Sequence, residues 1–126
     1  MLKVTCAIIE LNKKVLAVQR SECMTMPLKW EFPGGKLENN ESEEECIIRE
    51  IREELNIEIE LVARLTPSQI DDLDLSIFLI PFVAQHANGY IKLLEHKQYR
   101  WLNKDELKAL DWADADKPIL NEYLAL

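Results

Sequence analysis

Residues 42–56 form an amphipathic helix pattern with both ends marked, and no other segment constrains the fold as strongly. Ser42 and Glu45 match the S-x-x-E capping box, which predicts a helix from about Glu43 to Leu55. Asn56 stands where a C-cap glycine is expected, and asparagine tolerates the left-handed conformation needed there. The apolar positions recur on one stripe: Ile47, Ile48, Ile51 and Leu55. We therefore expect a helix with one face in the core.

Strands are predicted on both sides of this helix. Lys3–Glu10 and Val15–Gln19 are expected to pair as a hairpin around Asn12-Lys13. Pro33-Gly34-Gly35 is predicted to stop regular structure after Trp30-Glu31-Phe32. The other predicted strands are residues 57–65, which alternate in polarity, and the more continuously apolar residues 73–83, which suit a central strand.

The last part of the chain is predicted to hold shorter elements. Asn88-Gly89 favours a type I′ turn leading into a strand over Tyr90–Leu94, and Tyr99–Trp101 follows as a further strand. Two short helices are expected at Asp105–Leu110 and Pro118–Leu124. The 126 residues suffice for one domain, 1–126, and are too few for two.

Length and charge exclude several classes of protein. The longest apolar stretch, Leu75 to Ala84, has ten residues, whereas a bilayer span needs about twenty, so no membrane span is expected. Glu10 interrupts the first apolar run too early for a signal peptide, and we expect a cytoplasmic protein with three unpaired, mostly buried cysteines. The net charge is −8, and all of the excess lies between Glu38 and Glu60. Such a chain is not expected to bind nucleic acid duplex, which needs a basic surface.

The excess charge includes a carboxylate patch on the predicted helix. Glu50, Glu53 and Glu54 are related by i, i+3 and i+4, so their side chains share one face beside the apolar stripe. Arg49 and Arg52 are expected to point elsewhere. Like charges at this spacing destabilise a helix, and Mg²⁺ or Mn²⁺, which prefer carboxylate oxygens, would compensate them. The alternative is a solvated acidic face with no ligand.

The stretch GKLENNESEEECIIREIREELNI resembles the sequence motif of the Nudix hydrolases, G-x5-E-x7-R-E-U-x-E-E-x-G-U, in which U is aliphatic. We call these residues, 35–57, the Nudix box. Asn56 alone departs from the motif, in place of its last glycine. The matching positions are Gly35, Glu41, Arg49, Glu50, Ile51, Glu53, Glu54 and Ile57. The resemblance implies an α/β/α sandwich with a mixed β-sheet and a loop-helix-loop catalytic box.

The preceding WEFPGGK is similar to the MutT-like branch of that family, which hydrolyses nucleoside triphosphates to monophosphate and pyrophosphate. This resemblance implies a hydrolase with Mg²⁺, or Mn²⁺, as cofactor, for nucleotide pool cleansing or for turnover of the CTP or dCTP type. It also implies the metal ligands, which are the Gly34 carbonyl, Glu50, Glu53, Glu54 and Glu95. Catalytic roles fall to Glu50, Glu53 and Glu95, with Glu50 or Glu95 activating the water.

Other site residues have two interpretations each. Arg20 and Lys36 can face substrate phosphates or be plain surface cations. Phe32 can line a base pocket or belong to the core, and Asp116 can read a base edge or cap the last helix. Gly35, Glu41 and Arg49 are expected to be structural, with Glu41 and Arg49 as an ion pair.

Three functions remain in competition: a nucleoside triphosphate pyrophosphohydrolase, a hydrolase of another diphosphate-linked nucleoside, and a non-catalytic nucleotide-binding or cation-binding module. The intact Glu50, Glu53 and Glu54 argue against the last. The expected partner is a small nucleotide, and the chain is expected to be a monomer or a homodimer paired along the edge of its first hairpin.

Overall fold

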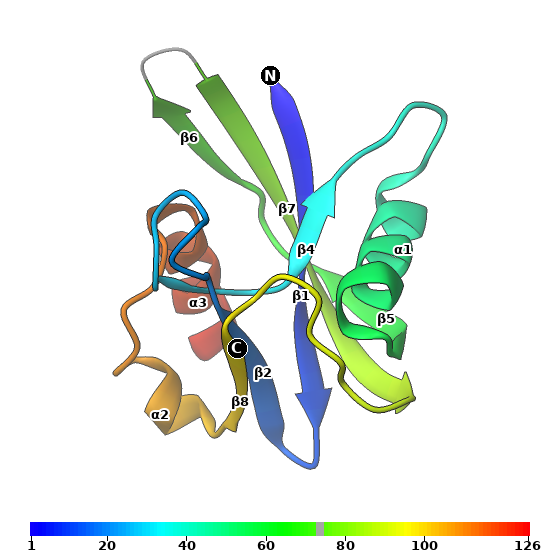
Figure 1. Ribbon diagram of the computed structural model, residues 1–126, viewed down its shortest axis with the longest axis vertical. Coiled ribbons are helices and arrows are strands. Elements are labelled where there is room, and N and C mark those ends of the chain that lie inside the picture. The colour runs from blue at the N-terminus through cyan, green and yellow to red at the C-terminus, as the bar shows by residue number, and fades with distance from the viewer. Residues whose placement is uncertain (73–74) are drawn as a thin grey trace.

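The computed structural model describes residues 1–72 and 75–126, so the predicted strand start at Leu73 lies outside the described residues. The described residues contain one sheet of eight strands with helices on both of its faces (Figure 1). The strands are β1 (Leu2–Leu11), β2 (Lys14–Gln19), β3 (Trp30–Glu31), β4 (Gly34–Lys36), β5 (Glu58–Arg64), β6 (Ser68–Asp72), β7 (Leu75–Asn88) and β8 (Gln98–Leu102). The helices are α1 (Glu43–Leu55), α2 (Lys104–Leu107), the short 3-10 helix η1 (Asp114–Asp116) and α3 (Lys117–Leu124).

The sheet is mixed, with β1 and β7 at its centre. The order is β3-β2-β1-β7-β5, and β1 runs parallel to β7 from the pair Leu2 and Ile77 to the pair Glu10 and Gln85. The other pairings are antiparallel. The central position of β7 confirms the prediction made from its continuous apolar sequence.

Two core layers lie on opposite faces of the sheet, as Figure 1 shows with α1 on one side and α2 and α3 on the other. Strand residues alternate between the faces, so Ile9 packs on the side of α1 and Ile8 on the side of α3. The predicted α/β/α sandwich is confirmed. No helix among the described residues is long and apolar enough to cross a membrane.

The first hairpin forms as predicted, but its edge is not free. Asn12 and Lys13 both have positive φ, 51° and 65°, as a two-residue turn of this kind requires. β8 pairs with β2 from Val15 to Gln19, and β3 pairs with Val18 and Gln19 on the opposite edge of β2. The chain's own strands therefore occupy this edge, and the choice between a monomer and a homodimer stays a prediction.

Pro33-Gly34-Gly35 does not end regular structure, contrary to expectation. Gly34–Lys36 forms β4, which pairs antiparallel with β1 and places Gly35 opposite Thr5. A Cβ atom on Gly34 would lie 1.9 Å from the Thr5 carbonyl oxygen, so only glycine allows this approach. The glycines therefore fasten the start of the Nudix box to the central strand.

Three further elements differ from the sequence-based expectations. Tyr90–Leu94 is not a strand, because Gly89 (φ 93°) ends β7 and the Lys92 amide donates to the Leu55 carbonyl of α1. The polar strand β6, which pairs with β7, was not predicted. The helix expected at Asp105–Leu110 is limited to Lys104–Leu107. Among the cysteines, Cys23 is exposed, whereas Cys6 and Cys46 are buried.

Candidate active site

The Nudix box is built on α1, whose ends form as the sequence indicates. The Ser42 hydroxyl accepts from the Glu45 amide at 3.1 Å, and the Glu45 carboxylate accepts from the Ser42 amide at 2.9 Å. Asn56 adopts the left-handed conformation (φ 61°, ψ 30°) and donates its amide to the Arg52 carbonyl. Its substitution for the motif glycine leaves the end of the helix intact.

Arg49 ties the start of the box to its helix. Its Nε and Nη2 atoms donate to the two carboxylate oxygens of Glu41 at 2.6 and 3.0 Å, which confirms the predicted ion pair. This bidentate contact lowers the pKa of Glu41 to about 2 and raises the pKa of Arg49. Its Nη2 atom also donates to the Lys36 carbonyl at 3.2 Å, so Arg49 also bonds to the end of β4.

Arg49 also contacts the carboxylate patch, contrary to the expectation that it points away. Its Nη1 atom donates to Glu50 at 2.8 Å and to Glu53 at 3.1 Å. The Arg49 side chain contacts both Glu41 and the carboxylate patch. The spacing of residues on one helix face does not reveal this double contact. The repulsion within the patch is therefore partly compensated by the chain itself.

The Glu50 carboxylate lies against Gly35 of β4. A Cβ atom on Gly35 would lie 2.2 Å from the Glu50 carboxyl carbon, so any larger residue there would displace this side chain. The Glu50 side chain is 14% exposed, compared with 57% for Glu53. Gly35 thus leaves room for a largely buried carboxylate beside the backbone of β4.

Glu54 is the member of the patch without a partner among the described residues. Its Oε2 atom is shut off from solvent and has no hydrogen-bond partner there. Burial, together with the negative charges of Glu50, Glu95, Glu31 and Glu53, raises the pKa of Glu54 to about 8. A buried carboxylate oxygen facing other carboxylates is a place where a cation would be stabilised.

Glu95 lies in the irregular segment of residues 89–97, which joins β7 to β8, and its side chain is exposed. It is nevertheless close enough for its charge to raise the pKa of Glu54. The fold thus brings Glu95, from a loop, close to the Nudix box.

The described residues do not contain a ready-made cluster of three or more metal-binding side chains. The contacts of Arg49 give the physical reason, since its guanidinium holds Glu50 and Glu53 in ion pairs. The donor set nevertheless fits a hard divalent ion, because the charges of nearby carboxylates act on Glu54, whose Oε2 atom has no hydrogen-bond partner among the described residues, and Gly34 directly precedes the box. The residues present fit the cation once Arg49 gives up its ion pairs with Glu50 and Glu53.

The two predicted phosphate-binding cations lie in different surroundings. Arg20 donates to Glu31 at 2.8 Å and to the Thr25 hydroxyl at 2.9 Å, so it is held within the polar loop of residues 21–29. Lys36 is exposed at the end of β4. Their roles toward a substrate stay predictions.

The two predicted base-binding residues meet each other. Phe32 is 3% exposed and lies against Trp112 with ring centroids 4.7 Å apart, as expected for a core residue. Asp116 is 4% exposed and accepts from the Phe32 amide at 2.8 Å. It makes no side-chain cap to α3, so the capping interpretation is wrong. Burial raises the pKa of Asp116 to about 8.

Sequence reasoning did not single out Glu31 and His96. Glu31 accepts from Arg20 with one oxygen, and its other oxygen lies 2.8 Å from Nε2 of His96. The only available sequence signal was their position, since Glu31 falls inside WEFPGGK and His96 directly follows Glu95.

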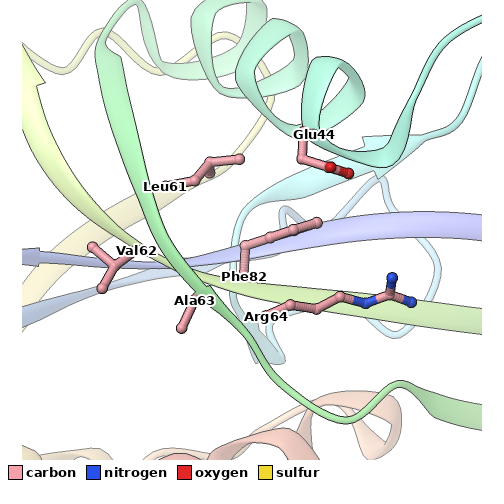
Figure 2. A pocket seen from close by; sticks show the side chains of 6 residues that line it. All are labelled: Glu44, Leu61, Val62, Ala63, Arg64 and Phe82. Carbon is pink, nitrogen blue, oxygen red and sulfur yellow. The ribbon is translucent and has the colours of Figure 1, made fainter.

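A shallow pocket of about 240 Å³ lies away from these residues, between the start of α1 and the strands β5 and β7 (Figure 2). In Figure 2, Glu44 reaches over it from α1, and Leu61 and Arg64 flank it from β5. The pocket contains none of the predicted site residues. This hollow is therefore not part of the candidate site.

The mixed α/β/α sandwich and the glutamate-bearing loop-helix-loop place the chain among the hydrolases that act on acid anhydrides. The NUDIX domain model matches residues 1–123, and the chain belongs to the Nudix family.

Similar proteins agree with this assignment. The chain is 33% identical to the CTP pyrophosphohydrolase of Escherichia coli, over 100% of this chain and 93% of that protein. It is 27% identical to the 8-oxo-dGTP diphosphatase of Escherichia coli, over 86% and 84% of the two chains. The solution structure of the E. coli ORF135 protein superposes with a TM-score of 0.87 at 33% identity, covering 100% of this chain and 90% of that one.

Proposed function

We propose that this chain hydrolyses nucleoside triphosphates to a nucleoside monophosphate and pyrophosphate with the help of Mg²⁺ or Mn²⁺. The observation that carries the proposal is the buried Glu54 oxygen, which has no partner among the described residues and lies within the influence of the charges of Glu50, Glu53 and Glu95. The similarity to the CTP pyrophosphohydrolase over the whole chain supports the triphosphate as substrate.

The proposed metal ligands are Glu50, Glu53, Glu54, Glu95 and the carbonyl of Gly34. A divalent ion bound there would neutralise phosphate charge and lower the pKa of a bound water. Glu50 or Glu95 would accept the proton of the attacking water, since both carboxylates act on the same site. Arg49 would keep its hydrogen bonds to Glu41 and give up those to Glu50 and Glu53, because its two contacts to Glu41 form a separate bidentate pair.

Arg20 and Lys36 are the proposed phosphate-binding cations, and Phe32 and Asp116 are proposed to lie at the base. Asp116 can accept a hydrogen bond from an exocyclic amino group, which cytosine, adenine and guanine carry and uracil and thymine lack. The buried position of Asp116 beside the Phe32 amide supports this preference, since a buried acceptor discriminates strongly between bases with and without a donor. We also propose that the protein acts in the cytoplasm, on the nucleotide pool.

The experiment is pyrophosphate release with Mg²⁺ across ribo- and deoxynucleoside triphosphates, including oxidised guanine and methylated cytosine, with Glu53→Gln as control. We expect Glu53-dependent release with the strongest preference among bases that carry an amino group. Weak turnover of every triphosphate, abolished by Glu53→Gln, would instead assign the chain to another diphosphate-linked nucleoside. Release that does not depend on Glu53 would overturn the proposal.

A further inference from the structure

Glu31 lies where three segments near the candidate site meet. It sits on β3, one residue before Phe32, and its two oxygens face two different partners. One oxygen accepts from Arg20 at 2.8 Å, and the other is 2.8 Å from Nε2 of His96. The Glu31 side chain is 17% exposed and that of His96 is 3% exposed, so this contact is shielded from water.

The contact to His96 fixes the segment that carries Glu95. Residues 89–97 have no regular structure, and backbone hydrogen bonds from Lys92 to Leu55 and from Lys97 to Gln19 hold their two ends. Between these ends, His96 inserts its ring toward β3 directly beside Glu95. The neighbouring ion pair of Lys97 with Glu22 is exposed, and exposed pairs of this kind contribute little.

The contact to Arg20 fixes a second segment. Arg20 directly follows β2, and its remaining donors reach the Thr25 carbonyl at 2.5 Å and the Thr25 hydroxyl at 2.9 Å. Glu31 therefore orients a guanidinium that also holds the loop of residues 21–29.

A further carboxylate in this place is unfavourable by itself. The charge of Glu31 raises the pKa of both Glu54 and Asp116, so it adds to the repulsion within the acidic site. A hydrophobic residue on β3 would avoid that repulsion. The contacts of Glu31 to Arg20 and His96 give a reason for a carboxylate at this position.

We propose that Glu31 is a positioning residue that holds Glu95 in place through His96 and holds Arg20 toward the substrate phosphates. This inference rests on the proposed function for the roles of Glu95 and Arg20. The contacts of Glu31 to His96 and to Arg20 have separate consequences, because Glu95 acts on the reaction step and Arg20 on substrate binding. Loss of the contact to His96 lowers kcat, whereas loss of both contacts lowers kcat and raises KM.

The test compares four variants with the wild type. His96→Leu and His96→Asn remove the contact, the latter with a shorter amide, whereas the amide of His96→Gln can donate to Glu31 as Nε2 does. We expect the first two to lower kcat about 10- to 100-fold, the usual range for residues that orient a metal ligand, with KM nearly constant. We expect His96→Gln to recover most of the loss, and Glu31→Met to lower kcat and also raise KM.

A second readout does not depend on activity. Backbone ¹⁵N relaxation of the metal-free protein should show greater mobility of residues 91–97 in His96→Leu and His96→Asn, with α1 unchanged. Lys97→Met is the matched control in the same loop, and it should leave the mobility of these residues, kcat and KM close to wild type.

Unchanged loop mobility and unchanged kcat in His96→Asn would overturn the inference, as would a His96→Gln variant as impaired as His96→Leu. If the wild type shows no Glu53-dependent hydrolysis, the proposed function fails. The relaxation measurement then decides the positioning role alone, since increased mobility supports it and unchanged mobility refutes it.

Discussion

Two glutamates toward opposite ends of the Nudix box lie in opposite environments. Glu41, at the start, accepts two hydrogen bonds from Arg49 and one from the Glu38 amide, and its pKa falls to about 2. Glu54, at the end of α1, has a buried oxygen with no partner among the described residues, and its pKa rises to about 8. A glutamate whose partners lie within the chain stabilises the fold, whereas one left without them is available to a ligand.

Exchange of each glutamate for glutamine should separate these two roles most strongly. We expect Glu54→Gln to lower turnover by about 10²-fold or more, the size seen when one transition-state stabilising group is removed, without lowering the melting temperature of the metal-free protein. Glu41→Gln should lower the melting temperature and affect turnover less. Steady-state kinetics and calorimetry on both variants test this, and the reverse ranking would refute the comparison.

The pH dependence of stability should distinguish the two ends as well. Raised pKa values of Glu54 and Asp116 mean that the folded state keeps their protons while the unfolded state loses them, so stability falls as pH rises from about 5 to about 8. The depressed pKa of Glu41 has the opposite sign, and its contribution is lost only as pH falls below about 4 toward 2.

Urea unfolding of the metal-free protein across this range measures both trends. Glu54→Gln and Asp116→Asn should each reduce the loss of stability toward pH 8. Neither should change the loss of stability as the pH falls below about 4. A wild type that gains stability between pH 5 and pH 8 would contradict these assignments. Saturating Mg²⁺ should restore stability at pH 8 in the wild type, by about 2.7 kcal/mol at a hundred times the dissociation constant, and not in Glu54→Gln.

Arg49 links the two ends and should show both effects. We expect Arg49→Met to lower the melting temperature by several degrees without metal, because it leaves Glu41, Glu50 and Glu53 uncompensated. Saturating Mg²⁺ should reduce this deficit, since the ion replaces the guanidinium at Glu50 and Glu53. Calorimetry with and without Mg²⁺ measures both values, and a deficit that Mg²⁺ leaves unaltered would show that Arg49 does not compete with the ion.

Asn56 should give the smallest effect. Asn56→Gly restores the motif residue in a left-handed position and should change stability by less than about 0.5 kcal/mol, with turnover unchanged. Asn56→Ala should destabilise by about 1 kcal/mol, because alanine is disfavoured in that conformation. Equal stability of the glycine and alanine variants in urea unfolding would mean that the helix end tolerates any residue.

The sequence predicted those features that depend on neighbours in the chain. The capping box of Ser42 and Glu45, the end of α1 at Asn56 and the turn at Asn12-Lys13 involve residues within a few positions, and all three form as expected. The pair of Glu41 and Arg49 was predictable for the same reason, since one helix and its preceding loop contain both residues.

Features that depend on distant contacts were missed or misplaced. The segment Tyr90–Leu94 has a strand-like composition, but its Lys92 amide bonds to the end of α1, and β6 forms from a polar sequence because β7 offers it an edge. Glu31 and His96 lie far apart in the chain and meet only in the folded sheet. Local pattern contains no information on such pairs.

The parallel pairing of β1 with β7 has a consequence for the order of folding. A chain growing from its N-terminus has made β1, β4 and every glutamate of α1 before the central strand β7 exists. Contacts between such distant segments form late and slow the folding of a domain. The nascent chain therefore carries the complete motif before the strand that pairs with β1 has been made.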